Sequence, residues 1–207
     1  MSNWFLVGGA VRDLQLGAEP ADMDYVYTGN YEDMMTGIRA RGITVYLEKP
    51  EFQTARVKSE KYGAVDIQSA IELFDNLGRR DFTINAMAYS EATGELYDPY
   101  GGLDDLRKFR LQTVKSPSST FINDPVRILR MLRFAIQYGL AIDPNILAVA
   151  RSEHLLKSIQ DAEPQRVRNE FEKLFKQHPA QVTQYLTFLG QETLSAFYAH
   201  VNLKFST

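Results

Sequence analysis

The chain has 207 residues, 44% of them hydrophobic, so it can bury one core of ordinary domain size or two smaller ones. The absence of cysteine excludes disulfides and thiolate chemistry, and the net charge of −3 argues against a coat protein that binds nucleic acid by broad phosphate neutralisation. No apolar run is long enough for a membrane span and no signal peptide is recognisable, so we expect no membrane partner and a cytoplasmic location.

Residues 4–115 alternate between short strand-like runs and short helical patterns, which indicates a mixed α/β region. The strand-like runs are, in chain order, FLV, MDYVY, ITVYL, TARVK, AVDIQ, ELYDP and RLQTV. From about Thr120 the pattern becomes helical, with further helices expected over 144–156, 164–177, 179–189 and 191–201. The segment 115–119 has the composition of a connector, so we expect two domains, residues 1–118 and residues 119–207.

Two glycines, Gly8 and Gly9, separate the first strand from the helical run AVRDLQLG. Backbone N–H groups in such a turn, together with the following helix N-terminus, can hold a phosphate group. Arg12 adds a planar guanidinium, whose N–H donors can also contact a phosphate group. Taken alone, a glycine pair before a helix is equally explained by turn geometry.

The run MDYVY carries Asp24 and is preceded directly by Asp22; in a strand these two carboxylates alternate and therefore share a face, with roughly 6–7 Å between their Cα atoms. A third, Asp66, lies between Val65 and Ile67, so it points away from the apolar face of its strand. Carboxylates on a rigid element are suited to the divalent cations used in phosphoryl transfer. The alternative is that these aspartates begin a strand or lie on a solvated face.

These residues belong to a longer series of motifs that resembles one family. The motifs are GGAVRDLQLG with ADMD, LGRRDFTINAMAYS at 77–90, YDPYGGLDDL at 97–106, NDPVRILRMLRFA at 123–135 and PQRVRNEFEKLF at 164–175. Their order resembles that of the class II tRNA nucleotidyltransferases and bacterial poly(A) polymerases, within the polymerase-β-like nucleotidyltransferase superfamily. The resemblance implies an α+β fold, in which a catalytic head with a mixed β-sheet precedes an all-α neck and a truncated body.

The resemblance also implies roles for individual residues. Asp22 and Asp24 would bind two Mg²⁺ ions, and Asp66 would be a third catalytic carboxylate. The implied nucleotide-binding residues are Gly8, Gly9, Arg12, Arg80, Asp81, Asn85, Asp124, Arg127, Arg130 and Arg133. Among them, Asp81 would favour the ribose 2′-hydroxyl, while Asp124 and Arg127 would read the edge of the incoming base.

The same residues can also be explained by structural roles that need no ligand. The run 79–81 would serve equally as an ion cluster at a helix start, and Asp124 with Arg127 as an i,i+3 ion pair. Three arginines, Arg127, Arg130 and Arg133, fall opposite the apolar side of one helix, so they would form either a phosphate-binding face or its solvated side.

The chain departs from the family at three places. Asn123 stands where a glutamate is usual, and the final residue, Thr207, leaves little of the helical body that grips tRNA in longer relatives. Only twelve residues, IQSAIELFDNLG, separate Asp66 from Arg79, where relatives carry a longer flexible loop. In this family a short loop is associated with enzymes that add only the two cytidines.

The sequence therefore predicts a template-independent RNA nucleotidyltransferase that adds C, and possibly A, to tRNA 3′ ends from CTP and ATP. Two alternatives stay open. One is a poly(A)-polymerase-like enzyme that adenylates RNA 3′ ends, and the other is a nucleotide-binding regulatory module without turnover.

Overall fold

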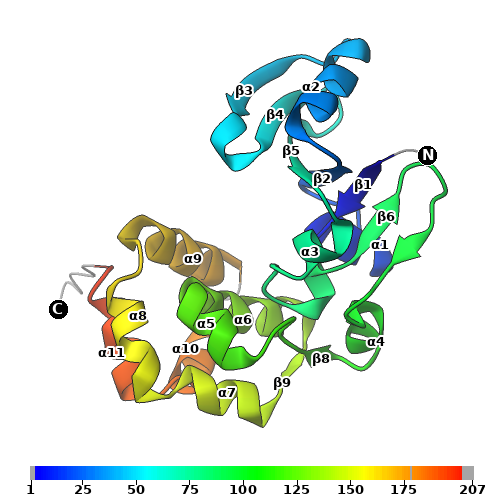
Figure 1. The fold of residues 1–207 in the computed structure, drawn as a ribbon. Coiled ribbons are helices and arrows are strands. Elements are labelled where there is room, and N and C mark those ends of the chain that lie inside the picture. Colours follow the sequence, from blue (N-terminus) through cyan, green and yellow to red (C-terminus); the bar gives the residue numbers. More distant parts are fainter. Residues whose placement is uncertain (1–2, 178, 202–207) are drawn as a thin grey trace. The chain divides into compact units, whose positions relative to one another are not determined.

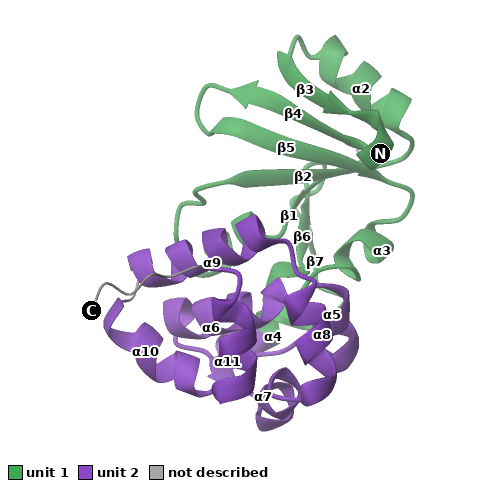
Figure 2. Cartoon of the chain, turned by 90° about the vertical axis from the view of Figure 1, so that its left-hand side faces the viewer, with its two compact units in different colours: residues 1–104 green, residues 105–207 purple. Residues whose placement is uncertain are grey.

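A computed structural model describes residues 3–177 and 179–201, which divide into two compact units (Figure 2). Unit 1 is Met1–Asp104 and unit 2 is Asp105–Thr207. The division precedes the boundary expected after residue 118, because two interactions tie this segment to unit 2. Strand β8 (Arg110–Leu111) pairs in parallel with β9 (Ala141–Ile142), and Arg110 forms an ion pair with Asp105. The roles of the units as catalytic head and neck stay predictions.

Within its described residues, unit 1 is built on a seven-stranded sheet in the order β3-β4-β5-β2-β1-β6-β7 (Figure 1). Its elements are β1 (Trp4–Val7), α1 (Gly9–Gln15), β2 (Met23–Thr28), α2 (Tyr31–Ala40), β3 (Val45–Lys49), η1 (Pro50–Phe52), β4 (Thr54–Ser59), β5 (Gly63–Ala70), α3 (Leu73–Leu77), η2 (Thr83–Asn85), β6 (Ala88–Ser90) and β7 (Leu96–Tyr97). The pair β2–β5 is parallel and the other neighbours are antiparallel. The expected mixed sheet is confirmed.

The two faces of the sheet differ because strand residues alternate in direction. In β5, Val65 and Ile67 are buried while Asp66 between them is exposed, as the sequence predicted. Helix α2 contacts β5 and buries Met34 and Met35. The central strands β2 and β5 can therefore present polar side chains on the face that carries Asp66.

Unit 2 is mainly helical. After α4 (Gly102–Arg107), which spans the division, its helices are α5 (Pro117–Asn123), α6 (Val126–Tyr138), α7 (Pro144–Ala150), η3 (Glu153–Leu155), α8 (Leu156–Gln160), α9 (Pro164–Gln177), α10 (Pro179–Thr187) and α11 (Gln191–Tyr198). Helix α6 contacts α5, α9 and α10, so almost its whole surface is buried. It ends at Gly139, whose φ of 63° is the left-handed conformation that glycine adopts without strain.

Most expected elements are present, with three differences. The single helix expected over 144–156 is wrong: α7 ends at Ala150, and the Ser152 hydroxyl donates back to the Val149 carbonyl, a local bond that competes with helix continuation. Strands β6 and β9 were not expected. Among the described residues, no helix is both long and apolar enough to cross a bilayer.

Candidate active site

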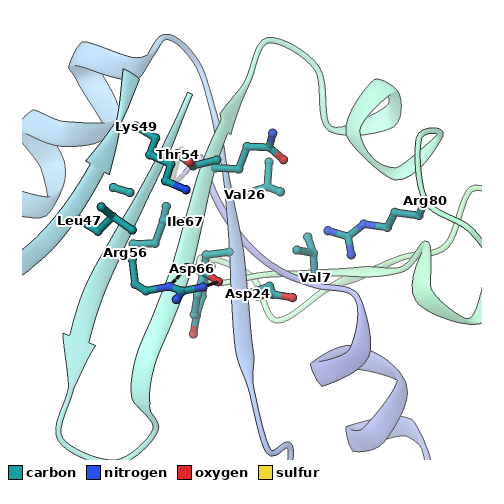
Figure 3. A pocket seen from close by; sticks show the side chains of 13 residues that line it. Val7, Asp24, Val26, Leu47, Lys49, Thr54, Arg56, Asp66, Ile67 and Arg80 are labelled. Carbon is teal, nitrogen blue, oxygen red and sulfur yellow. Dashed lines mark hydrogen bonds and ion pairs between the residues drawn. The ribbon is translucent and has the colours of Figure 1, made fainter. Parts of the chain in front are cut away.

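A cavity of about 360 Å³ lies on the polar face of the unit 1 sheet (Figure 3). Its lining residues come from β1 to β5 and from the segment after α3. They are Val7, Asp24, Tyr25, Val26, Leu47, Lys49, Thr54, Ala55, Arg56, Asp66, Ile67, Gln68 and Arg80. We call this cavity the sheet pocket. It combines two carboxylates with three cationic side chains in one concave site.

Asp24 and Asp66 are brought together by the parallel pairing of β2 and β5, in which they are direct partners. Adjacent strands are about 4.8 Å apart, so two in-register side chains on one face are close neighbours. Burial raises the pKa of the Asp24 carboxyl, Arg80 lowers it, and the charges of Asp66 and Asp22 raise it again, with a net upward shift. The carboxylates of Asp24, Asp66 and Asp22 thus repel one another, and a cation bound between them would relieve this repulsion.

Asp66 has a partner that sequence reasoning missed. Arg56 Nε and Nη2 donate to the two carboxylate oxygens of Asp66 at 2.5 and 2.6 Å, and this bond raises the pKa of the guanidinium (Figure 3). The two residues face each other because β4 and β5 pair in antiparallel register. The sequence held only a partial signal, because two strand-like runs joined by a short turn suggest a hairpin but do not fix the register that sets Arg56 opposite Asp66.

Asp22 is exposed and lies just before β2, so it is outside the strand on which it was expected to alternate with Asp24, although its charge reaches Asp24. Among the described residues, no three acidic or histidine side chains are gathered closely enough to hold a metal by themselves. The donors nevertheless fit a divalent ion such as Mg²⁺, which is commonly bound through one or two carboxylates together with substrate phosphates. Their roles as metal ligands stay predictions.

The glycine turn is adapted to Arg80. Gly8 has a φ of 75°, and a Cβ at this position would overlap the Arg80 guanidinium. Only glycine therefore allows this backbone conformation and this approach together. The Gly8 N–H, however, donates to the Met87 carbonyl at 3.2 Å, so this amide is not directed at a phosphate as expected.

Three other predicted nucleotide-binding residues lie beneath that turn. Arg12, Asp81 and Asn85 are 7%, 5% and 5% exposed. Arg12 Nη1 donates to Asn85 Oδ1 at 2.5 Å, and Asn85 Nδ2 donates to Asp81 Oδ1 at 3.0 Å. Arg12 also bonds to Asp13, and a Cβ on Gly9 would lie 3.3 Å from its guanidinium. We call Arg12, Asp81 and Asn85 the buried network; it holds the turn in place.

In unit 2, the expected pairing of Asp124 with Arg127 is present, with 3.6 Å between the Arg127 Nε and an Asp124 oxygen. A partner that was not expected, Arg166 of α9, donates to the same oxygen at 2.7 Å. The other oxygen, Oδ1, is buried without a hydrogen-bond partner among the described residues. It is therefore an acceptor suited to a ligand N–H.

The three arginines of α6 do not share one environment. Arg133 is 8% exposed and forms an ion pair with Glu170 of α9, so the alternative of a solvated side is excluded for this residue. The reason is that α9 covers this side of α6. Arg130 is half-buried, with its guanidinium 5.2 Å from the centre of the Phe134 ring. The nucleotide-binding roles of both residues stay predictions.

The segment between Asp66 and Arg79 is short and largely regular. Its first residues complete β5 and its last ones form α3, so Ile71 and Glu72 alone connect the two elements. The expectation that so short a connection cannot re-aim the base-reading pair stays a prediction.

Comparison with known proteins places these features in context. The family model of the poly A polymerase head domain matches residues 4–112. The multifunctional CCA protein of Xanthomonas campestris pv. campestris strain B100 is 36% identical over 186 residues, which cover 82% of this chain and 44% of that protein. The chain thus spans about half the length of the curated relatives it matches.

Comparison with solved structures also finds CCA-adding enzymes. A CCA-adding enzyme in complex with CTP matches with a TM-score of 0.78 and 29% identity, covering 89% of this chain and 46% of that one. The Thermotoga maritima CCA-adding enzyme complexed with tRNA matches with a TM-score of 0.74 and 28% identity, covering 89% and 47% of the two chains.

Proposed function

We propose that this chain, which belongs to the family of the poly A polymerase head domain, is a template-independent RNA nucleotidyltransferase that adds C, or C and A, to tRNA 3′ ends. CTP and ATP are its proposed nucleotide substrates and the RNA 3′ end is the acceptor. We place the reaction in the cytoplasm, where tRNA and NTPs are present.

The observation that carries the proposal is the arrangement of Asp24, Asp66 and Arg80 around one pocket (Figure 3). Two carboxylates in register can hold a divalent cation, and the guanidinium can pair with phosphate oxygens through its fork of donors. Nucleotidyl transfer needs both charges, because attack on the α-phosphate develops negative charge on the phosphate and on the leaving pyrophosphate.

The proposed roles follow from this geometry. Asp22 and Asp24 would hold two divalent cations, with Asp66 as a third carboxylate beside them; when bound, the cations would activate the 3′-hydroxyl and stabilise the leaving group. Arg80 would bind the triphosphate beside the Gly8 turn, and the buried network would keep that turn in shape. In unit 2, Asp124 and Arg127 would accept from and donate to the Watson–Crick edge of the base.

The test is incorporation of each NTP separately into three RNAs: a tRNA lacking CCA, the same tRNA ending in CC, and a generic oligonucleotide. We expect CTP to be added to the first RNA and addition of A to the second to be slow, because the connection between β5 and α3 is short. Efficient addition of A to the tRNA ending in CC would contradict the argument from the short connection. ATP incorporation into all three RNAs would instead identify a poly(A)-polymerase-like enzyme.

Base reading has its own test. Arg127→Ala should lose discrimination among the four NTPs by about 1–3 kcal/mol, the scale of one good bidentate contact to a base. If this variant discriminated among the four NTPs as well as the wild type does, Arg127 would not take part in selecting the base.

A second candidate is a nucleotide-binding module without turnover. It is favoured by the Arg56–Asp66 pair, which occupies both oxygens of one predicted catalytic carboxylate. Binding of CTP without incorporation into any of the three RNAs would support this candidate against the first.

A further inference from the structure

The side chain of Asn76 links the sheet to Arg80. Asn76 belongs to α3 and is 7% exposed. Its Nδ2 donates to Gln68 Oε1 at 2.8 Å, and its Oδ1 accepts from Arg80 Nη2 at 3.4 Å. Both ends of this buried amide are therefore used, one toward the sheet and the other toward the guanidinium.

Gln68 fixes the direction of that amide. It follows Asp66 by two residues in β5, so it shares the face of the sheet that carries the pocket, and it lines the pocket itself. Gln68 Oε1 accepts from the Asn76 nitrogen, and the Arg80 guanidinium can only donate, so the two contacts together hold the Asn76 amide with its nitrogen toward β5. The Asn76 oxygen is then the end left for Arg80.

Arg80 is held from a second direction as well. Its guanidinium lies against the Gly8 backbone, where a Cβ would overlap it, and it reaches toward Asp24 in the pocket (Figure 3). A free arginine side chain has about 2 kcal/mol of rotamer entropy, part of which is lost whenever it binds a ligand in one orientation. A side chain that is already oriented loses less on binding.

We propose that Asn76, oriented by Gln68, is a positioning residue that holds Arg80 ready for the triphosphate of the incoming nucleotide. The inference rests on the proposed function, since it assumes that Arg80 meets a triphosphate. It adds two residues, Gln68 and Asn76, that act through Arg80 and need no contact with the substrate.

The experiment measures the Kd of CTP and of CMP by calorimetry with Mg²⁺ and without RNA. Asn76→Leu keeps the shape branched at Cγ and removes both hydrogen bonds. It should weaken CTP binding about tenfold, the change expected for losing one hydrogen bond to a charged group, and leave CMP binding unchanged. In an Arg80→Ala background, Asn76→Leu should have no further effect on the Kd of CTP.

Two further variants complete the design. Gln68→Met removes the acceptor that orients Asn76, so it should weaken CTP binding in the same direction and add nothing to Asn76→Leu. Ser69→Ala is the matched control: Ser69 is the next residue in β5 and bonds to Gln53 at 3.2 Å, outside the path to Arg80. It should leave both Kd values unchanged.

The outcomes separate the inference from the proposed function. If Asn76→Leu weakened the binding of CTP and CMP equally, or weakened CTP binding as much in the Arg80→Ala background, Asn76 would have a role in folding only. That result would overturn the inference and leave the proposed function standing. An unchanged Kd in Gln68→Met would overturn the orienting step even where Asn76→Leu does not fold. A wild-type chain that binds neither nucleotide would overturn the proposed function together with the inference.

Discussion

Two regions of unit 1 draw on the same sequence motifs but place their residues in opposite surroundings. In the sheet pocket, Asp24, Asp66 and Arg80 line an open cavity. In the buried network, Arg12 and Asp81 are almost fully enclosed. Arg80 and Asp81 are neighbours in the chain and yet belong to different regions. A residue of these motifs can therefore contribute in two ways, by contacting the substrate or by supporting the turn beside the substrate. The exposure of its side chain distinguishes the two roles.

The largest effect expected in the pocket is that of Asp24→Ala. Incorporation of CTP should fall about 10³-fold, equivalent to about 4 kcal/mol of transition-state stabilisation, because a cation ligand is lost. Asp22→Ala should act in the same direction, and Asp66→Ala less strongly because Arg56 already occupies its oxygens. Single-turnover rates give the measurement, with Glu32→Ala in α2 as an exposed acidic control. Unchanged turnover in Asp24→Ala would remove the metal-ligand assignment.

In the buried network, the expected loss is one of stability. Asp81→Ala leaves the Asn85 amide and the Phe82 N–H without this acceptor, at a cost of about 1–3 kcal/mol in the free energy of unfolding. Denaturant titration measures that loss. The ratio of kcat/KM for CTP to kcat/KM for dCTP then tests the second predicted role of Asp81. An unaltered ratio in Asp81→Ala would limit Asp81 to the buried network. A ratio closer to one would show that Asp81 also contacts the ribose 2′-hydroxyl.

Arg56→Gln tests whether the arginine competes with a cation for the pocket. The Arg56 and Asp66 side chains are 45% and 50% exposed, so breaking this surface pair should change stability by less than about 1 kcal/mol. Removing the positive charge should tighten Mn²⁺ binding about fivefold, the factor that corresponds to about 1 kcal/mol. Titration of the metal followed by electron paramagnetic resonance measures it. Weaker Mn²⁺ binding in the variant would contradict the competition.

The smallest effect concerns the pH dependence of stability. The pKa of Asp24 is raised in the folded chain, so its ionisation opposes folding. This penalty is absent below about pH 4, where the carboxyl is protonated in both states, and complete once the pH exceeds the folded pKa. Asp24→Asn should therefore be more stable than the wild type at pH 7, with the difference shrinking toward pH 4. If the difference in stability between Asp24→Asn and the wild type grew as the pH fell, the pKa of Asp24 would not be raised by folding, and the argument would be contradicted.

Much of the fold could be predicted from local patterns, and so could the pair of Asp124 with Arg127 three residues apart, whereas the pairing of side chains between different elements could not. Alternation of Val65, Asp66 and Ile67 correctly gave the face of Asp66, because one strand decides it. The bond from Arg56 depends on the register between two strands, which the alternation of either strand alone does not fix. The solvated-side alternative failed for Arg133 because helical periodicity cannot show that a second helix, α9, covers the polar side of the first.

The most direct test of the claim that the sheet pocket is the nucleotide site is a crystal structure with CTP and Mn²⁺. The account predicts an anomalous manganese peak beside the Asp24 carboxylate and triphosphate oxygens on the Arg80 guanidinium, with Arg12, Asp81 and Asn85 still bonded to one another. Manganese and triphosphate bound away from Asp24, or a triphosphate held by Arg12 in an opened network, would contradict it.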